Sequence, residues 1–282
     1  MKAKMKLWKK IMLAFAAFII LAIILLTVIF FNTLRTIFSI KKISDVPVYS
    51  ARYYGDYALD EYLEHGAADS EELRDFLTDN LADGAGKLVY GDHGCSAFLG
   101  TTPDGDIIFA RNLDTSAGEG CILQTDNTEG SRMLAMSNLA WILEKPKKGL
   151  NLADKASVLA APYMITDGMN EYGLAAAVFS AGGSQSDIDK NKITLQENTV
   201  PALLLNKAKN VDEAVSLLMK YNISMTGFSQ YQYMICDESG NSAVIEFVNG
   251  KMQVVYKNGT YQICSNVILY DNPSMKGFGK DR

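Results

Sequence analysis

Gly94-Cys-Ser-Ala-Phe-Leu-Gly-Thr-Thr-Pro-Asp-Gly-Asp-Ile-Ile-Phe-Ala-Arg-Asn-Leu-Asp114 is the stretch that decides how this chain arranges its reactive residues. It places Cys95 at the head of a predicted strand, a Pro-Asp-Gly turn behind it, and a second strand ending near Arg111 and Asp114. Because a hairpin folds the chain back on itself, we expect Arg111 and Asp114 to return to Cys95, although 16 and 19 residues separate them. A thiol, a cation and a carboxylate are therefore predicted to converge; a surface ion pair of Arg111 and Asp114 is the alternative.

The residues around Cys95 favour nucleophilic chemistry by its thiol. A free cysteine has a pKa of about 8.5, and a guanidinium such as that of Arg111 favours the thiolate. The chain has only two histidines, His65 and His93, so a Cys-His or Ser-His-Asp arrangement has little material. His93, two residues before Cys95, is interpreted as an exposed loop residue, with a part in self-cleavage as the alternative.

The other three cysteines predict neither a disulfide framework nor a second nucleophile. Cys121, Cys236 and Cys264 each lie in an apolar, strand-like run, where buried cysteines are usually inert.

The hairpin of Cys95, together with Asp167-Gly-Met-Asn-Glu-Tyr-Gly-Leu174, resembles the N-terminal-nucleophile cysteine hydrolases. This group holds choloylglycine hydrolases, penicillin V acylases and acid ceramidase-like amidases. In it a peptide bond before the cysteine is cut and the freed α-amino group becomes the base. The resemblance, which covers roughly residues 94–282, therefore implies autocatalytic cleavage between Gly94 and Cys95.

The resemblance also implies roles for further residues. Asn266, in a Ser-Asn pair after an apolar run, would supply an oxyanion-hole amide, and Arg282, in a final Lys-Asp-Arg, would brace the site. Asp114 would orient the α-amine. Ser180 stands where many members carry asparagine or tyrosine. Two roles are open for this position: a backbone N-H that serves the oxyanion, or a side-chain contact with the substrate. The predicted catalytic set is Cys95, Arg111, Asp114, Asn266 and Arg282, while Asn170 and Glu171 are expected to shape a turn.

The function implied is hydrolysis of a linear, non-peptide amide through an acyl thioester, with a small acyl amide as substrate. Two alternatives remain open: acyl transfer from the same thioester, and a catalytically silent, membrane-tethered ligand-binding module. Relatives use bile-salt conjugates, penicillin V, N-acyl homoserine lactones and lipid amides. The sequence has no phosphate-cradling glycine loop and no zinc-ligand spacing, so no cofactor or metal is expected. Residues 95–282 carry a charge near −4, which argues against nucleic-acid binding.

The front of the chain predicts a membrane anchor. Residues 11–31 form an apolar run long enough to cross a hydrocarbon core of roughly 30 Å. Five lysines within residues 1–10 predict a cytoplasmic N-terminus and an extracytoplasmic catalytic domain at the cell membrane. A cleaved signal peptide is the alternative, but its apolar core would be shorter and a cleavage motif would follow.

Residues 32–94 are interpreted as an acidic, helical, juxtamembrane pro-segment. From Asp56 to Asp92 eleven acidic residues stand against Arg74 and Lys87, and residues 73–81 show helical periodicity. A solvated stalk is the alternative to a segment that covers the site until cleavage. Cleavage would either release the catalytic domain or leave it docked.

The remaining patterns predict an α+β fold. Seven strands are expected, at 95–101, 106–112, 173–180, 231–237, 242–248, 251–256 and 260–265, the last four as an antiparallel meander. Helices are expected at 200–208 and 211–221. The resemblance implies the four-layer αββα sandwich of N-terminal-nucleophile hydrolases for residues 95–282. These residues are few for the group, so we expect a C-terminally truncated domain.

Overall fold

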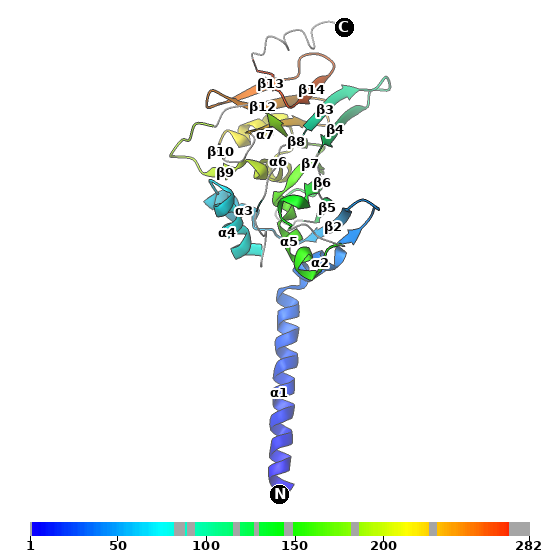
Figure 1. Cartoon of the computed structure of the whole chain (residues 1–282), viewed down its shortest axis with the longest axis vertical. Coiled ribbons are helices and arrows are strands. Elements are labelled where there is room, and N and C mark those ends of the chain that lie inside the picture. Colours follow the sequence, from blue (N-terminus) through cyan, green and yellow to red (C-terminus); the bar gives the residue numbers. More distant parts are fainter. Residues whose placement is uncertain are drawn as a thin grey trace.

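The computed structural model describes residues 2–81, 88, 94–114, 119–126, 130–143, 149–181, 186–225 and 230–270. A long helix, α1 (Lys2–Ile29), projects away from the remainder of the chain (Figure 1). Its segment Lys6–Ile29 is long and apolar enough to cross a membrane and is not buried by the protein. The helix ends two residues before the apolar run does, because α2 (Phe31–Ser39) begins at Phe31.

The chain before Gly94 contributes more than helices. It forms β1 (Lys41–Lys42), β2 (Val48–Tyr54), α3 (Leu59–His65) and α4 (Ser70–Leu81). The predicted helical periodicity is confirmed in α4, which buries Leu73 and Leu77. The sequence prediction lacked β2, which pairs in parallel with β5 (Gly120–Asp126) inside the main sheet. This part of the chain therefore packs into the core and is not a solvated stalk.

The main sheet has nine strands in the order β1-β2-β5-β6-β7-β8-β11-β12-β13. Its remaining members are β6 (Met133–Asn138), β7 (Ile165–Asn170), β8 (Ala175–Ala181), β11 (Gln230–Cys236), β12 (Ser242–Val248) and β13 (Lys251–Tyr256). Apart from the parallel β2 and β5 pair, all neighbours in it are antiparallel. The strands β11 to β13 form the meander that the sequence predicts.

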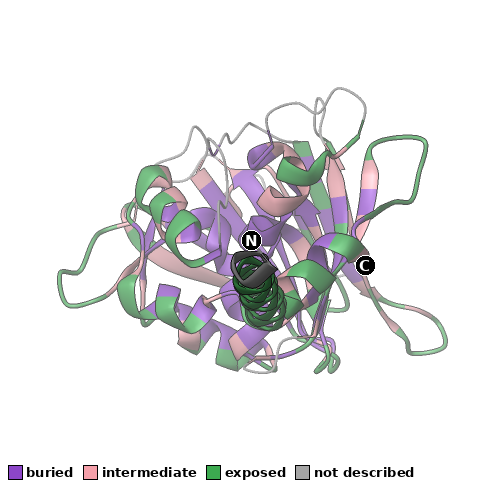
Figure 2. Ribbon diagram, turned by 90° about the horizontal axis from the view of Figure 1, so that it is seen from below, coloured by how far each residue is buried: buried purple, intermediate pink, exposed green. Residues whose placement is uncertain are grey.

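Helices cover one face of the main sheet. The covering elements are α2, α6 (Val200–Lys207), α7 (Val211–Leu218) and the 3-10 helix η2 (Val158–Tyr163), which follows α5 (Leu152–Ser157). Two further 3-10 helices, η1 (Leu139–Trp141) and η3 (Glu197–Thr199), and a parallel pair of short strands, β9 (Thr194–Gln196) and β10 (Asn222–Ser224), complete this side. In Figure 2 the buried segments gather inside the body and the exposed ones lie at its periphery.

A second, three-stranded sheet has the order β14-β3-β4 and packs on the other face, against β8. It consists of β3 (Gly94–Thr101), β4 (Ile107–Asp114) and β14 (Gln262–Ser265). The predicted β3 and β4 hairpin is confirmed in antiparallel register, with Gly94 opposite Asp114. The sequence prediction was wrong for β14, which pairs with β3 and not with the meander.

Side-chain alternation along β8 shows why two layers meet there. Ala176 and Val178 point into the core under the helices, whereas Ala177 and Phe179 face the small sheet. The outer face of the small sheet exposes Phe98, and within the described ranges no helical layer covers it. The structure therefore describes helix, sheet and sheet layers of a mixed α+β fold, and a fourth layer stays a prediction.

Candidate active site

Cys95 is the second residue of β3, and the alternation of that strand decides where its side chain points. Cys95, Ala97 and Leu99 are buried between the two sheets, while Ser96 and Phe98 are exposed. Cys95 is 5% exposed. The three-stranded sheet therefore holds the Cys95 thiol against β8.

Arg111 reaches the thiol from the neighbouring strand. It lies opposite Ala97 in the register, on the inward face of β4, and its side chain is 5% exposed. Its Nη2 lies 3.5 Å from Cys95 Sγ and donates to the carbonyl of Val178 at 2.8 Å. The guanidinium also lies 5.5 Å from the centre of the Phe179 ring, within cation–π range. The convergence of Cys95 and Arg111 predicted from the hairpin is confirmed.

The carboxylate that pairs with Arg111 is Asp167, a residue to which the sequence analysis gave no role. Arg111 Nη1 lies 2.9 Å from Asp167 Oδ2, and Thr166 Oγ1 donates to the same oxygen at 3.0 Å. A guanidinium this deeply buried needs an anion because its desolvation is costly. Asp167 opens the Asp-Gly-Met-Asn-Glu segment, so the motif was visible in the sequence while the pairing required the packing of β4 on β7.

Asn266 lies beside Cys95 although 171 residues separate them. The register of β14 against β3 pairs Ser265 with Ser96, so the next residue arrives at the head of β3. The backbone N-H of Cys95 donates to Asn266 Oδ1 at 2.5 Å, and Asn266 Nδ2 donates to the carbonyl of Ser180 at 2.6 Å. Asn266 thus bridges β3 and β8.

Ser180, the last buried residue of β8, is placed at the same point. It is 7% exposed, and its hydroxyl oxygen has no hydrogen-bond partner among the described residues. Its carbonyl faces Asn266, and its backbone forms a hydrogen bond with the Cys95 sulfur that lowers the pKa of that thiol.

Glu246, also missed by the sequence analysis, holds the segment that follows Asn266. This residue of β12 is fully buried and accepts hydrogen bonds from the backbone N-H groups of Leu269 at 2.7 Å and Tyr270 at 2.8 Å. Burial raises the pKa of its carboxyl above the ordinary value, while these two hydrogen bonds lower it. Nothing in the local sequence distinguishes this glutamate from a surface one.

Asp114 lies at the exposed end of β4, next to Gly94 and away from Arg111. It accepts a hydrogen bond from Asn112 Nδ2 at 2.8 Å. A Cβ at position 94 would lie 3.0 Å from Asp114 Oδ2, so glycine leaves room for the carboxylate beside the bond that joins Gly94 to Cys95. The described pairing of Arg111 with Asp167 replaces the surface ion pair considered as an alternative.

With Gly94 in place, the surroundings of Cys95 favour its neutral thiol over the thiolate. Burial raises the pKa of the thiol above its ordinary value, whereas the Arg111 guanidinium, the Ser180 backbone and Asn266 lower it and the charge of Asp114 raises it. Burial outweighs the cation. Arg111 lowers the pKa of Cys95, as the sequence predicted. The net pKa is nevertheless raised, so the prediction of a favoured thiolate was wrong for this form of the chain.

The other cysteines are all buried and free. Burial raises the pKa of Cys121 and Cys236 to about 12 and holds that of Cys264 well above its ordinary value. Arg282 and His93 lie outside the described residues. Within the described ranges no group of three His, Cys, Asp or Glu residues is placed to hold a metal ion.

The predicted turn after β7 is confirmed. Asn170 Oδ1 accepts from the backbone N-H groups of Tyr172 and Leu174, and Gly173 adopts a φ of +76° that favours glycine. On the surface, Arg132 Nε and Nη2 both donate to Glu171 Oε2, at 3.0 and 2.8 Å.

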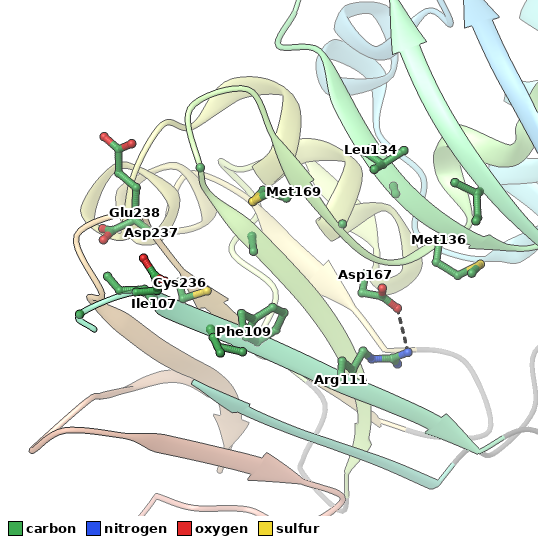
Figure 3. A pocket seen from close by; sticks show the side chains of 18 residues that line it. Ile107, Phe109, Arg111, Leu134, Met136, Asp167, Met169, Cys236, Asp237 and Glu238 are labelled. Carbon is green, nitrogen blue, oxygen red and sulfur yellow. Dashed lines mark hydrogen bonds and ion pairs between the residues drawn. The ribbon is translucent and has the colours of Figure 1, made fainter. Parts of the chain in front are cut away.

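A cavity of about 870 Å³ opens between β4 and the strands β6 and β7. Figure 3 shows the side chains of Arg111 and Asp167 joined at one end of it, with Asp237 and Glu238 at the other. Between these ends the wall is apolar and is formed by Ile107, Phe109, Ile122, Leu134, Met136 and Met169. Arg111 separates the cavity from the Cys95 sulfur, which does not line it.

Residues 95–272 match the family of linear amide C-N hydrolases, choloylglycine hydrolase family. A penicillin V acylase of Pectobacterium atrosepticum is 30% identical in an alignment of length 119 that covers 38% of this chain and 31% of that protein. The solved penicillin V acylase from Agrobacterium tumefaciens has a TM-score of 0.37 and 19% identity, covering 66% of this chain and 49% of that one. A mutant of the conjugated bile acid hydrolase from Clostridium perfringens has a TM-score of 0.38 and 19% identity, with coverages of 59% and 52%. The chain therefore spans about half the length of these two solved proteins. It spans about a third of the length of the Pectobacterium atrosepticum acylase.

Proposed function

Because the chain belongs to the choloylglycine hydrolase family of linear amide C-N hydrolases, we propose that it hydrolyses small acyl amides with Cys95 as the nucleophile. The proposal depends on the two contacts that Cys95 makes with Arg111 and Asn266. Cys95 has its sulfur 3.5 Å from a buried guanidinium and its backbone nitrogen 2.5 Å from a side-chain amide oxygen.

Maturation would begin at the peptide bond between Gly94 and Cys95. Its hydrolysis turns the Cys95 backbone nitrogen into an α-amine, whose usual pKa of about 7.7–8.0 suits it to accept the thiol proton near neutrality. Asn266 Oδ1 already accepts a hydrogen bond from this nitrogen, and Asp114 lies beside the residue that would depart. Sulfur and base would then belong to one residue.

The reaction then follows two steps. The sulfur attacks the amide carbonyl carbon, the α-amine takes the thiol proton and passes it to the leaving nitrogen, and the C-N bond breaks to leave an acyl thioester. Water next attacks the thioester carbon, the acid leaves, and the sulfur regains a proton. One water is consumed for each amide, and the products are one amine and one carboxylic acid.

We assign stabilisation of the oxyanion to two groups. An amide nitrogen carries two protons, so Asn266 Nδ2 can keep its bond to the Ser180 carbonyl and direct the second proton at the substrate. The Ser180 backbone, which faces the sulfur, supplies the second contact. Arg111, fixed by Asp167, lowers the energy of the thiolate as it forms.

The cavity beyond Arg111 supports an apolar acyl group as the part of the substrate that is bound. Its walls are aliphatic, aromatic and thioether side chains, and its volume of about 870 Å³ is within the range of small-molecule pockets. We further propose that α1 anchors the chain with its lysine-rich start in the cytoplasm and residues 95–282, the catalytic domain, outside.

Intact-mass measurement of the purified full-length chain tests the proposal. We expect a species that begins at Cys95 in the wild type and in Cys121→Ala, a control that removes a buried cysteine distant from the site, and its absence in Cys95→Ala. Activity is then measured on a panel of chromogenic acyl amides, with a competing amine added to detect acyl transfer. An active preparation that still carries Gly94 would overturn the mechanism, and a cut chain that releases no amine would favour the ligand-binding module.

A further inference from the structure

The described part of the chain before Gly94 supplies a strand of the main sheet. β2 pairs with β5 over seven residues in parallel register, from Val48 opposite Gly120 to Tyr54 opposite Asp126. Its alternate side chains Tyr49, Ala51 and Tyr53 are at most 4% exposed. We propose that, after a cut at the Gly94 and Cys95 bond, residues 1–94 remain bound as a permanent subunit that keeps the catalytic domain at the membrane. The cut and the anchor rest on the proposed function; the binding does not.

An aromatic cluster joins the two sides of the cut. It is defined by Tyr53, Tyr57, Tyr62 and Phe76 from before Gly94 and Tyr163 from after it. The ring of Tyr163 lies edge-on to Tyr57 at 6.2 Å and to Tyr62 at 5.4 Å, and its hydroxyl donates to the Tyr57 carbonyl at 2.8 Å. These three tyrosines are fully buried, so separating the two parts would expose all of them to water.

Buried polar groups are also satisfied across the cut. The Tyr62 hydroxyl oxygen accepts hydrogen bonds from Gln196 N at 3.0 Å and Thr199 Oγ1 at 3.2 Å. The Ala67 N-H donates to the Thr194 carbonyl at 2.9 Å. Because these partners come from opposite sides of Gly94, dissociation would leave buried donors unpaired unless the core opened.

The same elements connect the core to α1. Thr36 of α2 accepts from Tyr54 N at 3.0 Å through its hydroxyl, and Ser39 Oγ donates to the Arg52 carbonyl at 3.0 Å. α2 is therefore fastened to β2, and α1 precedes α2 directly. A continuous path of hydrogen-bonded elements runs from the apolar helix through α2 and β2 to β5, beyond the cut.

A protease cut at an engineered site tests the inference without relying on the chemistry of Cys95. A recognition sequence is inserted directly before Gly94 in full-length Cys95→Ala with an N-terminal affinity tag, and the protein is cut in its membranes. We expect the 95–282 fragment to sediment with the membranes in 1 M salt, to be captured by the tag in mild detergent, and to separate only in denaturant. Release of the fragment by the cut alone would overturn the inference.

The two proposals fail in distinguishable ways. A wild-type chain that never cuts itself, with protease-cut halves that stay together, would overturn the proposed maturation and support the subunit. A chain that cuts itself into halves that separate would do the reverse.

Two variants test whether the aromatic cluster holds the two parts of the cut chain together. Tyr57→Ala with Tyr62→Ala should raise the uncaptured fraction of the 95–282 fragment at least tenfold. Phe38→Ala, which removes an aromatic residue of α2 that is 72% exposed, should leave it unchanged. Circular dichroism before the cut shows whether each variant is folded. If the double variant is unfolded, capture of the 95–282 fragment without these substitutions decides the question. A folded double variant with unchanged capture would overturn the assignment to the aromatic cluster.

Discussion

The two sheets differ in what each does for the molecule. The nine-stranded sheet carries the large core, with side chains from before and after Gly94 and a helical layer on one face. The three-stranded sheet carries Cys95 and Arg111, rests on a much smaller core, and lies at the end of the body opposite α1 (Figure 1). Asp167, Val178 and Ser180 meet the small sheet from the large one. Most of the buried core therefore belongs to one sheet, and the proposed catalytic residues lie at its seam with the other. Substitutions should accordingly separate effects on stability from effects on catalysis.

The largest expected effect is on stability and comes from the large core, between the nine-stranded sheet and its helical layer. Tyr163→Ala removes a fully buried aromatic residue, and truncations of this kind cost about 3–5 kcal/mol of unfolding free energy. Urea unfolding measures the loss. The control Tyr256→Ala, at a tyrosine of β13 that is 52% exposed, should leave stability nearly unchanged. Equal losses in the two variants would contradict the assignment of stability to this core.

The next effect is on catalysis and comes from the seam. Asn266→Ala removes the proposed oxyanion donor, which costs about 2.7–4 kcal/mol of activation free energy, a fall in kcat of about 10²–10³-fold. The measurement is kcat on the mature enzyme, with unfolding followed in parallel. Asn258→Ala, on an exposed loop, is the matched control. A kcat that changes less than tenfold would contradict the assignment of Asn266 to the oxyanion hole.

A smaller effect concerns the titration of the thiol in the uncut chain. Arg111 lowers the pKa of Cys95, so Arg111→Gln should raise that pKa further above its already raised value. At a fixed pH the thiolate fraction then falls, by tenfold for each pKa unit of about 1.36 kcal/mol. Alkylation of Cys95 by iodoacetamide, followed by peptide mass analysis from pH 7 to 10, should shift to higher pH. The surface variant Arg132→Gln should not shift it, and an unchanged profile in Arg111→Gln would contradict the contact.

The smallest expected effect comes from Glu246. Because the folded protein raises the pKa of Glu246, the unfolded chain loses this proton at a lower pH than the folded one. The contribution of Glu246 to the free energy of unfolding is therefore full below about pH 4.3 and falls as the pH rises through the folded pKa. Glu246→Gln removes that dependence and one of two acceptors for Leu269 and Tyr270, at a cost of about 0.5–1.5 kcal/mol. Urea unfolding at pH 4.5 and pH 7 compares the two proteins, with the exposed Glu238→Gln as the control. Parallel pH profiles in the wild type and Glu246→Gln would contradict the prediction.

The parts of the fold that the sequence predicted are those set by local patterns. Alternating residues, the Pro-Asp-Gly turn and the helical periodicity located β3, β4, β11, β12, β13, α6 and α7 with bounds close to those observed. β2 was missed because its Val-Tyr-Ser-Ala-Arg-Tyr-Tyr lies within residues 32–94, which were interpreted as a helical pro-segment. β14 was found, but its partner was not, since pairing with β3 depends on contacts across more than 160 residues.

The candidate site divides in the same way. The spacing of Cys95 and Arg111 in one hairpin predicted their approach, which needs only antiparallel pairing. The ion pair with Asp167 and the anchoring by Glu246 depend on how one sheet packs on the other, for which no sequence pattern exists. The sign of the net pKa shift at Cys95 was missed for the same reason, because burial is a property of the assembled layers.

The parallel pairing of β2 with β5 has a practical consequence for producing this protein. A recombinant chain started at Cys95 would reproduce the proposed mature terminus but would leave β5 with an open row of N-H and C=O groups along seven residues. Such an edge recruits strands from other molecules, so we expect the shortened product to aggregate. Soluble, active material should come from the longer precursor, lacking at most α1, because the proposed maturation needs the chain to fold before it is cut.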